Sequence, residues 1–208
     1  MVCRICNQTT QPFYQYQQKV YFFCSNCQSV QLDGSCFLTS AEEKAHYLNH
    51  QNVSIDLGYR AFVQPVTDAV MQNFNNHHIG LDFGSGKDAA VVAILKEKGY
   101  QIQAYDPFFF PDLNWDEQKF DFITATEVVE HLHHPLQTFK KLKDALKPKG
   151  KLFIMTELLP TETSFAHWYY KNDPTHVTFY SVKTMQWLAD YLEFSKVTIQ
   201  KRLVMMGV

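Results

Sequence analysis

Two glycines between an apolar strand and an apolar helix constrain the fold of this chain most. Residues 81–86 read Leu-Asp-Phe-Gly-Ser-Gly, and residues 89–95 read as a buried helix. A strand, a glycine turn and a helix form the first unit of a nucleotide-binding α/β sheet. Gly84 and Gly86 allow a tight turn and a close approach of the backbone to a ligand. We therefore predict an α/β protein with a Rossmann-like, doubly wound and mostly parallel sheet.

Two acidic residues frame this turn. Asp82 comes just before the first glycine, and Asp106 ends the next expected strand, residues 100–105. Asp106 lies about 20 residues past the glycines, where such folds place an acid that binds ribose hydroxyls. A carboxylate beneath the turn suits a ligand with an ammonium group better than one with a pyrophosphate, because like charges repel. We expect Asp82, Gly84, Gly86 and Asp106 to bind a nucleoside with a cationic tail.

Further segments carry a family resemblance. Residues 82–86 resemble the first motif of the class I S-adenosylmethionine-dependent methyltransferases, residues 120–131 their fourth-strand motif, and residues 146–154 their turn into strand five. The resemblance covers roughly residues 59–208 and implies S-adenosylmethionine as the cofactor. It also suggests a set of further donor contacts, namely Tyr59 on the leading helix, Glu127 after strand four, and Phe108 in place of an adenine contact after strand three. For Tyr59, a place in the core is an equal alternative.

The glycine motif also leaves other functions open. Asp88 stands in place of the family's third glycine, and Gly84-x-Gly86-x-x-Ala89 fits the dinucleotide-binding pattern, so an NAD-dependent oxidoreductase is an alternative. Asp82 and the absence of a second substrate domain favour the methyl donor. A non-catalytic protein that binds the donor or zinc is another alternative.

Two expected strands of a methyltransferase sheet are in doubt. Prolines and polar residues between Asp106 and Phe120 interrupt any alternating segment, so we expect no third strand and a short sheet edge. The chain stops soon after residues 196–201, which leaves little for the final antiparallel strand.

Four cysteines near the N-terminus have metal-ligand spacing. Cys3 and Cys6 form one pair, Cys24 and Cys27 form another, and 17 residues separate the pairs. This pattern is typical of a structural zinc site, whose closed shell of four sulfurs leaves no position for catalysis. Free thiols or a redox pair are the alternative. We predict one structural Zn²⁺ in a zinc-ribbon module over residues 1–38, followed by a helix and linker at 39–58 and the methyltransferase domain at 59–208.

Composition narrows the class of partner. Zinc ribbons occur on nucleic-acid enzymes, so an RNA methyltransferase is an alternative function. The formal net charge of −2 and the sequence pI of about 6.5 give no electrostatic support for it. No segment approaches the roughly 18 apolar residues of a membrane span, and none resembles a signal peptide. We expect a cytoplasmic enzyme with a small-molecule acceptor and neither membrane nor nucleic acid as a partner; the sequence does not indicate its oligomeric state.

Two histidines are candidates for a catalytic base. His131 follows strand four, and His176 lies in an aromatic loop after strand five. Both positions lie at the C-terminal ends of strands, where open α/β sheets bind ligands. For each histidine, a capping or packing role is the alternative.

The second of these loops carries a narrower resemblance. Residues 173–181 and the cysteine segment 24–32 resemble the zinc-containing sugar C-methyltransferases. His176 matches that family's loop, whereas Asp173 and Thr175 replace its tyrosine and glutamate, so its carbon-acid mechanism does not transfer. We predict C- or O-methylation with His176 or His131 as the base. Three aromatic residues are expected to enclose the acceptor, namely Trp168, Tyr169 and Tyr180.

Overall fold

The structure, a computed structural model, describes residues 1–48, 56–159 and 165–208. Residues 49–55 of the expected helix and linker at 39–58 lie outside these ranges. The strands are β1 Gln11–Tyr16, β2 Lys19–Phe23, β3 Val30–Leu32, β4 Ile79–Phe83, β5 Gln101–Tyr105, β6 Phe120–Thr126, β7 Leu146–Met155, β8 Thr178–Phe179, β9 Lys196–Gln200 and β10 Leu203–Gly207. The α-helices are α1 Ser40–Leu48, α2 Leu57–Asn73, α3 Ala90–Glu97, α4 Pro135–Asp144 and α5 Val182–Tyr191. Among the described residues, no helix is long and apolar enough to cross a membrane.

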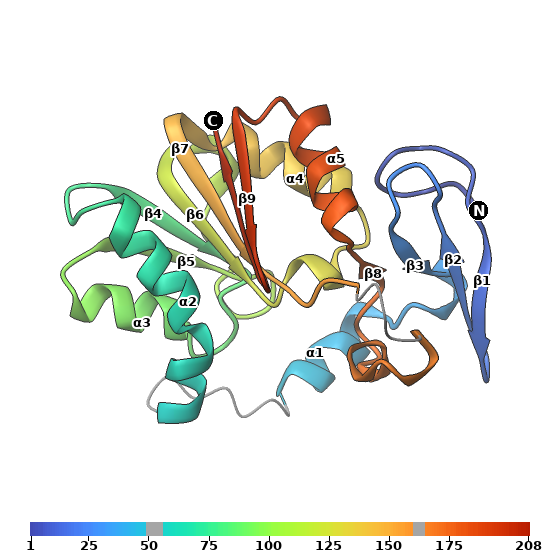
Figure 1. Ribbon diagram of the computed structural model, residues 1–208. Helices are drawn as coiled ribbons and strands as arrows, with labels where there is room; N and C mark the ends of the chain where they lie inside the picture. The colour runs from blue at the N-terminus through green and yellow to red at the C-terminus, as the bar shows by residue number, and fades with distance from the viewer. Residues whose placement is uncertain (49–55, 160–164) are drawn as a thin grey trace.

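Six strands form the main sheet, in the order β5-β4-β6-β7-β10-β9. The pairs β4–β5, β4–β6 and β6–β7 are parallel, and β10 is antiparallel to both β7 and β9. Helices α2 and α3 cover one face of the sheet and α4 and α5 the other (Figure 1). The predicted α/β fold is confirmed, with a mixed sheet.

The pleat of β7 shows why both faces are covered. Leu152 and Ile154 are buried in the cluster on the α4 and α5 side, whereas Phe153 and Met155 are buried in the cluster on the α2 and α3 side. Successive side chains of a strand point to opposite faces, so a continuous apolar run requires helices on both sides.

The expectations for the third strand and for the final antiparallel strand have different outcomes. The chain between β5 and β6 contains no strand beyond an isolated bridge from Asp106 to Phe110, so β5 is the sheet edge, as predicted. The expectation that little remains for a final antiparallel strand was wrong. A two-residue turn follows Gln200, with Lys201 at φ 54°, and lets β10 insert between β9 and β7. Five residues suffice because β10 is paired on both sides and buries its apolar side chains in the sheet.

A second sheet joins the N-terminal segment to the loop after β7. Its order is β1-β2-β3-β8, and β8 pairs with β3 through Val30–Phe179 and Gln31–Thr178. Arg4 strengthens this join, because its guanidinium donates hydrogen bonds to the carbonyls of Leu32 and Val177. The N-terminal segment therefore holds in place the loop that carries His176.

Candidate active site

A cavity of about 850 Å³ lies at the C-terminal ends of β4, β5 and β6. The nine residues predicted from the sequence to bind the donor or act as a base all line it: Tyr59, Asp82, Gly84, Gly86, Asp106, Phe108, Glu127, His131 and His176. Helix α1 adds Glu43 and Tyr47, which sequence reasoning did not find. The side chain of Tyr47 contacts Phe108 and His131, with ring centroids 5.7 and 5.5 Å apart.

The glycine turn has the backbone conformation that its sequence predicts. Gly84 has φ +71°, and a Cβ there would come within 2.6 Å of Val128 Cγ2. Gly86 has φ +66°, and a Cβ there would meet open space. Both positions disfavour other residues, the first through a close approach and the second through backbone strain.

Asp106 holds the rim of the cavity together. Its carboxylate accepts hydrogen bonds from the amide of Gly86 at 3.1 Å and from the amides of Phe108 and Phe109 at 2.8 and 3.2 Å. One side chain thus connects the glycine turn to the turn after β5, which carries Phe108 on the cavity wall.

Asp82 is buried beneath the glycine turn, with 2% of its surface exposed. The Thr124 hydroxyl donates a hydrogen bond of 2.7 Å to Asp82 Oδ1. Burial raises the pKa of Asp82 to about 7, despite the opposing effect of that hydrogen bond. A cationic group placed nearby would favour the ionised carboxylate, so the position is suited to a ligand that carries an ammonium group.

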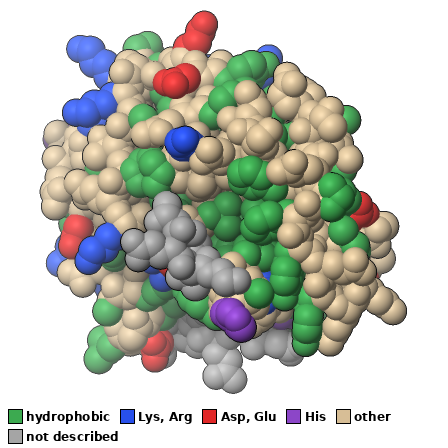
Figure 2. Space-filling model, turned by 45° about the vertical axis from the view of Figure 1, so that its right-hand side comes forward, with side chains coloured by type: hydrophobic (Ala, Val, Ile, Leu, Met, Phe, Trp, Pro, Cys, Tyr) green, Lys and Arg blue, Asp and Glu red, His purple; other side chains and the backbone are tan. Residues whose placement is uncertain are grey.

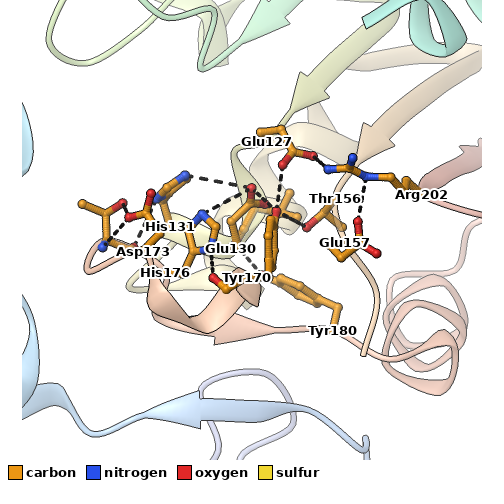
Figure 3. Close-up of polar contacts among 12 residues, drawn as sticks. Glu127, Glu130, His131, Thr156, Glu157, Tyr170, Asp173, His176, Tyr180 and Arg202 are labelled. Atoms are coloured by element: carbon orange, nitrogen blue, oxygen red, sulfur yellow. Dashed lines mark hydrogen bonds and ion pairs between the residues drawn. The ribbon is translucent and has the colours of Figure 1, made fainter. Parts of the chain in front are cut away.

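Three titratable side chains form a cluster at the cavity (Figure 3): His131 and His176 line it, and the fully buried Glu130 lies next to both. His131 ends the 3-10 helix Val129–His131, and His176 lies just before β8. Their Nε2 atoms are 3.9 and 4.0 Å from the same atom, Oε1 of the fully buried Glu130. The two rings are in edge contact, with centroids 4.7 Å apart. Folding thus brings together the two histidines that the sequence separates by 45 positions.

Backbone carbonyls orient both imidazoles. His131 Nδ1 is 3.1 Å from the Thr175 carbonyl oxygen, and His176 Nδ1 is 2.6 Å from the Tyr170 carbonyl oxygen. Because a carbonyl only accepts, each Nδ1 carries a proton. Burial lowers the pKa of His131, which keeps this imidazole neutral near pH 7.

A buried polar network supports the cluster and was missed in the sequence. Glu130 accepts hydrogen bonds from the Tyr170 hydroxyl at 2.5 Å and from the Thr156 hydroxyl at 2.9 Å. Tyr170 also lies 3.1 Å from Glu127 Oε2, and Arg202, in the turn before β10, donates to Glu127 Oε1 at 2.9 Å. Figure 3 shows these side chains converging from separate elements. Burial, together with the Glu130 charge, raises the pKa of Glu127 to about 8.

The aromatic residues expected around the acceptor lie elsewhere, so that expectation was wrong. Trp168 and Tyr180 are buried in hydrophobic clusters, and the Tyr180 hydroxyl donates to the Val129 carbonyl at 2.8 Å. Tyr169 is 62% exposed. None of the three lines the cavity. Aromatic residues of this loop pack against β2 and β3, because the second sheet needs its own core.

The four N-terminal cysteines come together in two loops of matching geometry. Asn7 and Gln28, which follow the second cysteine of each pair, have φ 57° and 58°, and their amides donate to the carbonyls of Cys3 and Cys24. The four Sγ atoms all lie within 4.8 Å of one another, and two of their separations are 3.6 Å (Cys3–Cys27) and 3.3 Å (Cys6–Cys24). Tetrahedral zinc with Zn–S of about 2.3 Å separates its sulfurs by about 3.8 Å, so these side chains fit the ion.

Polar side chains also surround this cysteine cluster. Gln31 Nε2 donates to Cys3 Sγ at 3.0 Å, and Ser29 Oγ lies 3.2 Å from Cys27 Sγ. Such donors stabilise thiolates. Cys36 lies outside the cluster, half-buried near the Gln18 carbonyl.

Comparisons with known proteins agree with this geometry. The sequence matches the model of a methyltransferase domain family over residues 57–199. No curated protein sequence matches the chain significantly. One similar solved structure is a 1,6-didemethyltoxoflavin-N1-methyltransferase from Burkholderia thailandensis with bound 1,6-didemethyltoxoflavin and S-adenosylhomocysteine. It is 14% identical with a TM-score of 0.58, and the match covers 95% of this chain and 98% of that one.

Two further structures share the fold. A SAM-dependent methyltransferase from Archaeoglobus fulgidus is 18% identical with a TM-score of 0.55, over 67% of this chain and 71% of the other. An O-methyltransferase family protein from Burkholderia thailandensis is 10% identical with a TM-score of 0.56, over 79% of this chain and 61% of the other. At these identities the likeness concerns the fold. The family match spans more than half of the chain, so the protein belongs to the methyltransferase domain family and is a methyltransferase.

Proposed function

We propose that the protein transfers the methyl group of S-adenosylmethionine to carbon or oxygen of a small-molecule acceptor. The observation that carries the proposal is the arrangement of one cavity. Asp82, the glycine turn, Asp106, His131 and His176 all line it. We assign the first three to a donor end and the two histidines to an acceptor end. S-adenosylmethionine supplies a methyl group on a sulfonium, and the chain's residues must bind and orient both reactants.

The donor end fits the chemistry of this cofactor. Asp82 offers a buried carboxyl to an ammonium group, and Asp106 offers a carboxylate to ribose hydroxyls. Phe108 and Tyr59 provide apolar surface in the same cavity. The Thr126 hydroxyl, also on the cavity wall, has no hydrogen-bond partner among the described residues. A bound polar ligand would satisfy it.

The other end suits an acceptor that must lose a proton. His176 and His131 are held by backbone carbonyls with Nε2 as the basic atom. A neutral imidazole is a suitable base near neutral pH. Both residues face the same cavity as the glycine turn, so either one is placed to orient and deprotonate the acceptor.

We also propose that Cys3, Cys6, Cys24 and Cys27 hold one structural zinc ion. Their spacing in the folded chain, the matching loops and the surrounding donors support it. The ion would stabilise the loops that precede β1 and β3, and through β8 the loop of His176.

The face shown in Figure 2 does not favour RNA as the acceptor. On the face shown in Figure 2, hydrophobic side chains gather, whereas Lys and Arg side chains are scattered toward its upper and left margins. Tracking of phosphates needs a continuous basic patch.

Donor specificity provides the first test. We expect S-adenosylmethionine and S-adenosylhomocysteine to bind in calorimetric titrations and NAD not to bind, because Asp82 opposes a pyrophosphate. Asp106→Ala should weaken donor binding by about 1–3 kcal/mol through the loss of charge-assisted hydrogen bonds. Asp112→Ala, an exposed change in the same loop, is the control and should leave affinity unchanged. Tight binding of NAD without a response to the methyl donor would refute the assignment.

The buried Asp82 provides a second test, based on pH. Its pKa is raised from 3.8 to about 7 in the folded protein. The free energy of unfolding therefore falls as the pH rises from about 4 to 7, and this loss of stability is complete above pH 7. Asp82→Asn should therefore stabilise the ligand-free protein by about 1–4 kcal/mol at pH 8 and by little at pH 4. The same variant should bind the donor more weakly, because the ammonium loses its partner.

Urea unfolding at both pH values, with Asp112→Asn as the control, measures the stability change. Equal stability changes at pH 4 and pH 8 would contradict a raised pKa of the buried Asp82 carboxyl. Unchanged donor affinity would contradict its role toward the ammonium.

A further inference from the structure

The three titratable side chains at the acceptor end have the geometry of metal ligands. Glu130 Oε1, His131 Nε2 and His176 Nε2 all lie within 4.8 Å of one another. The distances of 3.9 and 4.0 Å from the two nitrogens to Oε1 are too long for hydrogen bonds. Ligands about 2.1 Å from an ion lie about 3 to 4 Å apart, so shifts of less than about 1 Å bring all three atoms to one ion.

The surroundings of these atoms match those of a metal site. Each histidine donates Nδ1–H to a backbone carbonyl, which fixes the tautomer with Nε2 as the ligand atom. The Glu130 carboxylate is held by Tyr170 and Thr156. An oxygen with two lone pairs can accept the Tyr170 hydroxyl and still bind an ion. The ligands and their orienting partners are therefore both present.

We propose that Glu130, His131 and His176 bind a divalent first-row transition-metal ion at the acceptor end of the cavity. Two imidazoles and one carboxylate favour zinc, manganese, iron or cobalt over magnesium, which prefers oxygen ligands. Among the described residues, three offer ligand atoms here, so positions remain open for an acceptor. This site is separate from the four cysteines, which form a closed set of sulfur ligands.

The proposal rests on the proposed function and refines its acceptor class to molecules with a hydroxyl group. An acceptor hydroxyl bound to the ion loses its proton to solvent at lower pH than in water. The oxygen lone pair then forms the O–CH₃ bond while the S–CH₃ bond breaks. The electron pair of that bond stays on sulfur, and S-adenosylhomocysteine leaves. His131 and His176 thus orient and activate the acceptor through the ion.

Titration with cobalt tests the site without an acceptor. Full-length protein is first loaded with one zinc per chain, so that the cysteines are filled, and Co²⁺ is then added. We expect one further equivalent to bind, with visible absorption but without the near-ultraviolet charge-transfer bands of cobalt thiolates. Glu130→Gln, which keeps the side-chain shape, and His176→Ala should each weaken this binding at least about 100-fold. His134→Ala, an exposed histidine three positions after His131, should bind cobalt as the wild type does.

Binding of S-adenosylhomocysteine to the same preparations separates the possible failures. If the wild type binds this product but no further cobalt, or if both ligand variants keep wild-type cobalt affinity, the metal site is refuted and the methyl-transfer proposal stands. If the wild type does not bind the product, the proposed function itself is contradicted. Should a variant fail to fold, the wild-type titration alone tests the proposed site. Thiolate charge-transfer bands from the added cobalt would show that it binds the cysteines, which would refute the site.

Discussion

Removing the zinc proposed for the N-terminal cysteines is expected to unfold the sheet of β1, β2, β3 and β8. Structural zinc contributes about 10–16 kcal/mol of apparent binding free energy in zinc-finger peptides, so its loss should lower stability by several kcal/mol. The four cysteines are buried and would lose the ion that joins their loops. Elemental analysis should find one zinc per chain in the wild type and less in Cys24→Ser. Thermal unfolding should show an earlier transition in that variant.

The fold predicts how far this damage spreads. Because β3 pairs with β8, and Arg4 bonds to the Val177 carbonyl, the loop that carries His176 should become mobile as well. Donor binding at the glycine turn should persist, since its elements belong to the main sheet. Cys36→Ser, a half-buried cysteine outside the cluster, is the matched control. Zinc-free protein that unfolds at the wild-type temperature would show that the cysteines have no structural role.

Replacing His176 is expected to give the largest loss of turnover. Loss of a positioned base typically lowers the rate by about 10²–10⁴. Since we assign His176 to the acceptor end rather than to the donor end, His176→Ala should leave affinity for the donor nearly intact. Single-turnover rates with an identified acceptor measure the first effect, and calorimetry with S-adenosylhomocysteine measures the second.

His167→Ala is a suitable control, because that exposed histidine lies in the same loop and outside the cavity. If His176 binds the proposed ion, wild-type turnover should depend on Co²⁺ or Zn²⁺ at the second site, and turnover of His176→Ala should not respond to added metal. Wild-type turnover that is independent of added metal would identify His176 as a base instead. Methylation by His176→Ala at the wild-type rate would return this residue to a packing role and leave His131 as the candidate.

Features encoded by neighbouring residues were predictable from the sequence. The glycine turn needs Gly84 and Gly86 because of its own backbone angles, and the cysteine pairs need only local loops to present two sulfurs each. The position of Asp106 after β5 follows from strand length. These signals sufficed for the fold class, for the methyltransferase family and for residues that line the cavity around the glycine turn.

Features created by packing were not predictable. Strand β10 was missed because its five residues are stabilised by pairing with β7, which lies far away in the sequence, as well as with β9. Strand β8 has two residues and exists because β3 offers it an edge. Arg202 approaches Glu127 across 75 positions, and Tyr170 approaches Glu130 across 40, so no local pattern marks either pair.

The sequence by itself determined the glycine turn with its acidic neighbours and the two cysteine pairs, since backbone conformation and residue spacing act over a few residues. Only the tertiary structure decided that His131 and His176 lie together. Their imidazoles meet at Glu130 because β8 joins the N-terminal sheet while the 3-10 helix Val129–His131 follows β6. Burial of that carboxylate, with Tyr170 and Thr156 as its donors, depends on packing between segments far apart in the chain.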